Sequence, residues 1–210
     1  MKLASSVLAA ACAAALSLTA AAAAPDALKD PSKVTAKSPE VFKAKFDTTK
    51  GVFVIEVHRD WAPNGADRFY ALVKNGYYDG VKFFRVVPGF VVQWGIHGDP
   101  AIAKTWLQST IKDDPVKESN KKGYVTYAKS NAPNSRSVQL FINLQDNTGL
   151  DSKWFAPFGK VVEGMDVVNK LNGEYTEGLT QLQGRIADEG NAFLEKHYPN
   201  LDAINKATIE

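Results

Sequence analysis

Cysteine is nearly absent from this sequence: Cys12 is the single one among 210 residues. It lies in an apolar run at the N-terminus, so the rest of the chain has no thiol and can form no disulfide. A chain of this length can bury a sizeable core without cross-links, and we expect one folded domain. Packing of the core must therefore stabilise the fold, even if the protein works outside the cytoplasm.

Histidines are few, and the sequence has no large excess of either charge. The three histidines are scattered, and no pair has the spacing of metal ligands on a helix. Lysine and arginine number 25 against 23 acidic residues, a net charge of +2, and Glu118 interrupts the basic patch at 117–122. We therefore expect no metal, no cofactor and no nucleic-acid partner.

The N-terminal region differs in composition from the rest. Lys2 is followed by an uncharged run, 3–24, made mostly of alanine and leucine, whose last alanines offer A-x-A cleavage sites. We predict a signal peptide at 1–24, cleaved between Ala20 and Ala24, and hence a periplasmic or secreted protein without stable membrane association. If the run were not cleaved, it would be long enough to anchor the chain in a bilayer.

Beyond this run, the pattern is mainly that of short strands. Residues 25–40 are polar and contain prolines, which predicts a flexible leader before a folded domain at 41–210. Helical spacing predicts helices at 61–75, 164–171 and 186–197, whereas 96–122 reads as a long connection. Alternating and apolar runs predict strands at 41–46, 52–57, 83–87, 91–95, 123–128, 139–144, 157–162 and 206–209. Many short strands with few helices favour an antiparallel barrel over alternating βαβ units.

A predicted hairpin at 83–95 carries an unexpected charge. Aromatic and β-branched residues flank Pro88-Gly89, and Arg85 lies within the first of these runs. A two-residue loop would point Arg85 and Gln93 to opposite faces, whereas a three-residue loop at 88–90 would pair them on one face. The pattern alone leaves open whether that face is a small binding site or an ordinary solvated surface.

Three ordered sequence blocks extend this observation. They are 83–95 (FFRVVPGFVVQWG), 127–143 (beginning YAKSNAPNS and ending QLFIN) and 150–165 (ending PFGKVVEGM). In order and spacing they resemble the cyclophilins, the peptidyl-prolyl cis/trans isomerases. The resemblance covers about 41–171 and implies a mainly β fold, a closed eight-stranded antiparallel barrel capped by two helices. A helical insertion at about 183–198 would add an extra C-terminal helix, and the resemblance favours the three-residue hairpin loop.

The resemblance also implies a function. A peptidylprolyl isomerase would accelerate rotation of X-Pro bonds in proline-containing polypeptides, here exported proteins in the course of folding, and we expect a monomer. Arg85 resembles the catalytic arginine, which would donate a hydrogen bond to the prolyl nitrogen of the twisted bond. Residues that match the substrate-binding groove are Phe90, Val91, Gln93, Ala128, Lys129, Gln139, Phe141, Leu150 and Phe155. A non-catalytic proline-peptide binding module or holdase chaperone would use the same groove and is the alternative.

Four positions depart from the family pattern. Lys129 stands where eukaryotic members commonly have asparagine, Leu140 replaces a phenylalanine, and Phe155 replaces the pocket histidine. Gly149 stands where cyclosporin-sensitive members carry tryptophan, so we predict weak cyclosporin binding. These differences predict a groove that is more apolar than that of the best-studied relatives.

Overall fold

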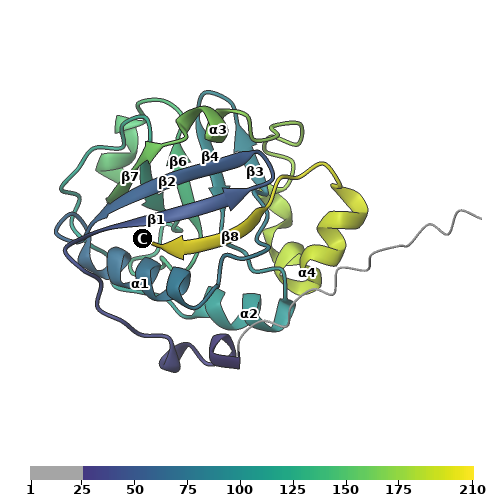
Figure 1. The fold of residues 1–210 in the computed structure, drawn as a ribbon, viewed down its shortest axis with the longest axis horizontal. Coiled ribbons are helices and arrows are strands. Elements are labelled where there is room, and N and C mark those ends of the chain that lie inside the picture. The colour runs from purple at the N-terminus through teal and green to yellow at the C-terminus, as the bar shows by residue number, and fades with distance from the viewer. Residues whose placement is uncertain (1–25) are drawn as a thin grey trace, which may run out of the picture.

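One curled sheet of eight strands forms the body of the molecule (Figure 1). The computed structural model describes residues 26–210, and the strand order is β3-β4-β6-β5-β7-β2-β1-β8. The strands are β1 Val41–Thr48, β2 Gly51–His58, β3 Arg85–Val87, β4 Val91–Trp94, β5 Tyr124–Tyr127, β6 Leu140–Asn143, β7 Pro157–Glu163 and β8 Ile204–Ile209. All neighbouring strands are antiparallel. The predicted mainly β, antiparallel fold is confirmed.

The edge strands β3 and β8 approach each other without forming a ladder. In the described part of the chain, an isolated bridge between Lys82 and Ala203 links the residues that precede them. The backbone N–H of Phe83 also donates to the carbonyl of Asp202 at 3.0 Å. The sheet is therefore a strongly curled half-barrel rather than the completely closed barrel that the resemblance implied.

The core lies inside the curl of the sheet and is rich in aromatic rings. Alternation along β1 and β2 turns Phe46 and Phe53 inward, where the rings stack with centroids 5.1 Å apart. Phe69 of helix α1 (Pro63–Lys74) packs on Phe46 and on Phe158 of β7. Trp94 of β4 meets Phe46 edge-on, and all these side chains are buried. The strands of the hairpin therefore rest on a closely packed support.

Helix α1 begins without a capping side chain of its own. Ala62 precedes it, and Asp114, from a distant loop, accepts hydrogen bonds from the N–H groups of Asn64 and Gly65 at 3.1 and 2.9 Å. Arg136 donates to the same carboxylate at 3.0 Å. Asp114 thus accepts hydrogen bonds both from the backbone N–H groups in the first turn of α1 and from a buried guanidinium.

The other helices within 26–210 are α2 (Pro100–Gln108), α3 (Met165–Asn169) and α4 (Gln183–His197). Short 3-10 helices span Asp26–Lys29 (η1), Pro31–Lys33 (η2), Thr148–Lys153 (η3) and Thr180–Leu182 (η4). The prediction of a plain connection at 96–122 was wrong about α2. Asp99 caps this helix by accepting from Ala101 N–H at 2.8 Å, and Pro100 lies in its first turn. Among the described residues, no helix has the length and apolar character needed to cross a membrane.

The predicted flexible leader is instead packed against the domain. Leu28 is fully buried, and its carbonyl accepts from Trp106 Nε1 at 2.7 Å. Ser38 donates to Asp67 through both its N–H and its hydroxyl, at 2.9 and 3.0 Å. The prediction failed because the few buried apolar residues of this polar segment, Leu28 and Val34, acquire their partners only from the folded domain. The predicted signal peptide at 1–24 lies outside the described residues.

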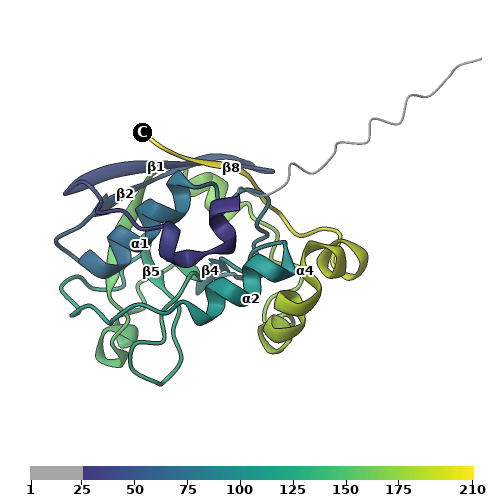
Figure 2. The ribbon, with the colours of Figure 1, turned by 90° about the horizontal axis from the view of Figure 1, so that it is seen from below.

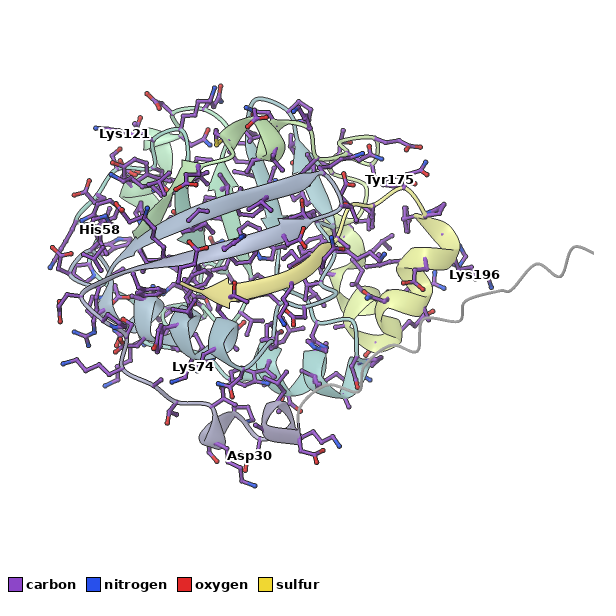
Figure 3. All side chains as sticks on the ribbon, viewed as in Figure 1. Asp30, His58, Lys74, Lys121, Tyr175 and Lys196 are labelled. Atoms are coloured by element: carbon purple, nitrogen blue, oxygen red, sulfur yellow. The ribbon has the colours of Figure 1, made fainter. Side chains whose placement is uncertain are left out.

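Residues 172–203, the α4 segment, connect α3 to β8. Figure 2 shows α4 beside α2, and in Figure 3 Tyr175 lies between the sheet and α4 while Lys196 points outward from the helix. A Cβ atom on Gly190 would lie 2.1 Å from the carbonyl oxygen of Gly98, so the two backbones are in close contact. A second buried cluster holds the segment on the domain: Leu179, Ile186, Phe193 and Leu194 against Phe84, Ile96 and Ala103.

Candidate functional site

Arg85 and Gln93 face each other across the hairpin of β3 and β4. They are direct partners in the ladder, Val87 pairs with Val91, and the loop between them is 88–90. Arg85 Nη1 donates to Gln93 Oε1 at 2.9 Å, and the guanidinium carbon lies 5.4 Å from the centre of the Phe90 ring. The prediction of a three-residue loop with both polar groups on one face is confirmed.

A cavity of about 230 Å³ opens beside this pair. Among the residues that line it are nine of the ten predicted ones: Arg85, Phe90, Val91, Gln93, Ala128, Lys129, Phe141, Leu150 and Phe155. The tenth, Gln139, accepts from Gln93 Nε2 at 2.8 Å and lines an adjoining cavity of about 330 Å³. The fold thus brings together side chains from the hairpin, β6 and three loops.

The apolar end of the cavity is formed by β6 and the chain around η3. Phe141 lies opposite Gln93 in the β4–β6 ladder. The Phe155 ring meets the Phe141 ring edge-on with centroids 5.9 Å apart, and Leu150 of η3 lines the same cavity. The result is a small apolar pocket directly beside a guanidinium and an amide.

A polar network fixes the loop that carries Leu150 and Phe155. Asp151 accepts from the Ser119 hydroxyl at 2.5 Å and from the backbone and side-chain nitrogens of Asn120 at 2.9 and 2.8 Å. Asn120 Nδ2 also donates to the Phe155 carbonyl at 2.9 Å. Burial acts to raise the pKa of Asp151, but the hydrogen bonds from Ser119 and Asn120 outweigh it and lower that pKa. An ionised Asp151 therefore holds the pocket loop in one conformation.

Both cations that line the cavity have a carboxylate partner. Lys129 Nζ lies 3.9 Å from Asp113 Oδ2. Arg85 donates through Nε and Nη2 to the two oxygens of Glu177, at 2.8 and 2.6 Å. The hydrogen bonds from Arg85 lower the pKa of Glu177, against the opposite effect of its partial burial. Glu177 is therefore ionised at neutral pH.

The α4 segment supplies functional candidates that were not predicted from the sequence. Thr180 and Gln183 line the cavity, and Gln183 Oε1 accepts from Gln139 Nε2 at 3.0 Å. Glu177 is 92 residues from Arg85, and no local pattern around it signals the contact. Within 26–210, no group of metal-ligating side chains gathers at this site or elsewhere.

Comparison with known proteins assigns this arrangement to a family. The family model described as cyclophilin type peptidyl-prolyl cis-trans isomerase/CLD matches residues 43–189. The chain belongs to this cyclophilin family. Two solved structures share the cyclophilin fold. A cyclophilin type peptidyl-prolyl cis-trans isomerase from Cryptosporidium parvum has a TM-score of 0.59 and 18% identity, covering 81% of this chain and 98% of that one. A cyclophilin from Hirschia baltica has a TM-score of 0.60 and 21% identity, covering 83% and 76%.

Bacterial cyclophilins are among the relatives in sequence. The peptidyl-prolyl cis-trans isomerase of Acinetobacter baylyi is 34% identical over 134 residues, which are 59% of this chain and 68% of the relative. Peptidyl-prolyl cis-trans isomerase B of Escherichia coli is 33% identical over 139 residues, 62% of this chain and 84% of that protein.

The departures from the cyclophilin pattern lie around the apolar end of the groove. Phe155, expected from the sequence to stand in place of the family's pocket histidine, lines the cavity. Lys129 Nζ lies 5.9 Å from the centre of that ring, and Leu140 is fully buried in the core. A Cβ atom on Gly149 would meet nothing within 4 Å, so the rim is open where the tryptophan of cyclosporin-sensitive members is expected.

Proposed function

We propose that this cyclophilin accelerates cis/trans rotation of X-Pro bonds and that Arg85 is its catalytic residue. The observation that carries the proposal is the position of the Arg85 guanidinium beside the apolar pocket, next to the Gln93 amide. The substrate class is a proline-containing polypeptide, because a pyrrolidine ring is compact and apolar and is flanked by peptide groups. The isomerase names of the relatives support the same activity.

The chemistry needs a hydrogen-bond donor and no proton relay. Rotation of a peptide bond has a barrier of about 18–20 kcal/mol because the nitrogen lone pair is shared with the carbonyl. Uncatalysed exchange at proline takes about 10–100 s. In the twisted state the lone pair is localised on the prolyl nitrogen, which then accepts a hydrogen bond better than in either planar state. A donor aimed at that nitrogen therefore lowers the barrier by binding the twisted state selectively.

The pocket residues have complementary roles in this proposal. Phe141, Leu150 and Phe155 hold the proline ring, so that rotation displaces the other side of the bond. Gln93 orients Arg85 through Nη1 and is itself oriented by Gln139, which accepts from its amide. The reaction uses only groups of this chain and the substrate.

Isomerisation of a proline tetrapeptide tests the proposal. Arg85→Ala should lower the rate constant by about a hundred- to a thousandfold, by analogy with the loss of one oxyanion-hole donor. Arg85→Lys should restore little of it, because an ammonium group lacks the planar fork. Affinity for a proline peptide, measured on the same variants, separates catalysis from binding. If the unmodified protein binds the peptide but leaves its exchange at the uncatalysed rate, the binding-module alternative replaces this proposal.

We further propose that the substrates are exported proteins and that the enzyme acts as a monomer. The support for export is the composition of 1–24, which has the charged start and apolar run of a signal peptide. Mass spectrometry of the protein from a fractionated bacterial host should find an N-terminus produced by cleavage between Ala20 and Ala24, in the periplasmic fraction. An uncleaved chain in the cytoplasm would contradict export without affecting the isomerase proposal.

A further inference from the structure

We propose that Glu177 is a positioning residue for Arg85, and that the α4 segment is thereby part of the catalytic apparatus. The inference rests on the isomerase activity proposed above. Glu177 lies outside the three sequence blocks at 83–95, 127–143 and 150–165, although within the range 43–189 that the family model matches, and it is 92 residues from Arg85. Its ion pair with the proposed catalytic side chain, at 2.6 Å, is nevertheless shorter than that of the other cation in the cavity lining, Lys129, which lies 3.9 Å from Asp113.

The contact constrains the guanidinium from one edge. Nε and Nη2 donate to the two carboxylate oxygens of Glu177 at 2.8 and 2.6 Å, a two-point arrangement that fixes the plane of the fork. Nη1 is held separately by Gln93 at 2.9 Å, and the Phe90 ring lies beneath the group. An arginine side chain otherwise has a large rotamer entropy, so these contacts select one orientation before substrate arrives.

The same geometry leaves donors free for the substrate. A guanidinium has five N–H groups: one on Nε and two on each terminal nitrogen. Glu177 takes the Nε hydrogen and one on Nη2, and Gln93 takes one on Nη1. One N–H on Nη1 and one on Nη2 remain, which suffices for a prolyl nitrogen and a neighbouring carbonyl.

Glu177 does not block the groove. Of the residues described at 26–210, those that line the cavity of about 230 Å³ include Arg85, Thr180 and Gln183, but not Glu177. The carboxylate is therefore not part of the cavity wall. A competing, autoinhibitory acid would be expected to occupy the cavity itself.

A well-packed scaffold holds Glu177 in this place. The Thr180 hydroxyl donates to Glu177 Oε2 at 2.7 Å, and Gln183 is tied to the groove through Gln139 at 3.0 Å. Leu179, which lies between Glu177 and Thr180 in the sequence, is fully buried in the second apolar cluster. The α4 segment thus presents its acid from a fixed surface, as a pre-organised catalytic site requires.

Substitution of Glu177 tests the inference. Glu177→Ala should lower kcat by about ten- to a hundredfold, with little change in KM, because the acid orients the donor and does not touch substrate. Thr180→Val, which removes only the supporting hydroxyl, should lower kcat by about threefold. The matched control is Glu189→Ala. Glu189 lies on α4 and pairs with Arg185 at 2.5 Å, so its substitution removes the same charge from the same segment. Its kcat should equal that of the unmodified protein.

Two further readouts separate positioning from a purely structural role. The Arg85 Nε–H resonance should be visible and protected from exchange at neutral pH in the unmodified protein, and lost in Glu177→Gln. Since the pKa of Glu177 is lowered, its pairing with Arg85 persists above the ordinary glutamate value of 4.5 and is lost only as the pH falls below it. The charged group that faces Glu177 is Arg85 on β3, and its other partner, Thr180, does not titrate. kcat should therefore fall below pH 4.5, and Glu177→Gln should lack that fall.

The outcomes are distinguishable from a failure of the proposed function. If the unmodified protein has only the uncatalysed rate, the isomerase proposal fails, while the Nε–H resonance still reports on the pair. If Glu177→Ala is as active as the unmodified protein, or more active, Glu177 is idle or inhibitory and the inference is overturned. If kcat falls equally in Glu189→Ala, the effect is a general one of charge in the segment, which also overturns it.

Discussion

Asp114→Ala should destabilise the fold severely, because Asp114 serves two buried partners. Its carboxylate lies 3.0 Å from Arg136 Nη2, and both side chains are 1% exposed. Loss of one member of a buried pair costs about 3–5 kcal/mol, since the other charge stays buried. The first turn of α1 also loses the acceptor of Asn64 and Gly65, which adds about 1 kcal/mol. Asp113 Oδ1, 3.3 Å from Arg136 Nε, compensates in part, so we expect about 4 kcal/mol.

Urea unfolding at neutral pH, followed by tryptophan fluorescence and far-ultraviolet circular dichroism, measures this loss. A domain of this kind has a free energy of unfolding of about 5–15 kcal/mol, so the variant should have a far lower midpoint. Asp166→Ala is the control: its partner is Lys170, the two side chains are 71% and 64% exposed, and the urea midpoint should stay close to that of the unmodified protein.

A second variant tests the assigned cause. Asp114→Ala combined with Arg136→Met removes the stranded charge and should recover part of the lost stability. A loss below about 1 kcal/mol in the single variant, or a double variant no more stable than the single one, would refute the reasoning.

Two other predictions concern glycines at the groove. Gly95→Ala should cost about 2–4 kcal/mol and disturb the site: Gly95 has a φ of +121°, and an added Cβ would lie 2.4 Å from the Val138 carbonyl oxygen, beside Gln139. Urea unfolding checks this against Gly149→Ala, where the space is open and the change should be small. Cyclosporin should bind the unmodified protein weakly, and Gly149→Trp should tighten binding without loss of stability. A titration that found nanomolar affinity for the unmodified protein would contradict this.

The strands were predictable because the signals for them are local, whereas the register of the hairpin was not settled by local signals. Alternation along Val41–Thr48 and Gly51–His58 reflects one buried face of a sheet, a pattern visible in any half-buried strand. The hairpin loop needed more than alternation, since both loop lengths suit Pro88-Gly89. The matching blocks decided for the loop that pairs Arg85 with Gln93, and the ladder agrees.

The parts that were missed depend on tertiary contacts. Leu28 and Val34 are isolated buried apolar residues in a mostly polar stretch. Leu28 becomes fully buried because α2 packs beside it, with Trp106 donating to its carbonyl. Helix α2 itself carries Asp99 and Pro100 at its start, but its buried face is only Ile102, Ala103 and Trp106, too few positions for a periodic pattern. A barrel was expected from the many short strands as well as from the resemblance, but complete closure depends on how the two edge strands meet, which strand patterns do not specify.

The residues of the site likewise fall into those that were predicted from the sequence and those that only the structure shows. Residues on the hairpin, on β6 and around η3 were predicted by their place in the sequence blocks, and they line one cavity. Glu177, Thr180 and Gln183 belong to a segment with no such block, and only the folded chain places them at Arg85 and Gln139. Contacts between residues that are far apart in the sequence and share no motif cannot be predicted from a single sequence.

A carboxylate bound to a catalytic donor would be harmful if it took the donor's proton. Arginine does not allow this, because its guanidinium stays protonated in proteins at any accessible pH. A lysine at position 85 would place a compact ammonium group beside the same acid, without the planar fork that fixes a second N–H in direction. The pairing with Glu177 at 2.6 and 2.8 Å therefore orients Arg85 and leaves its guanidinium protonated. The proposed mechanism transfers no proton, so it requires only a donor that is fixed in direction and permanently charged, and the ion pair with Glu177 is compatible with it.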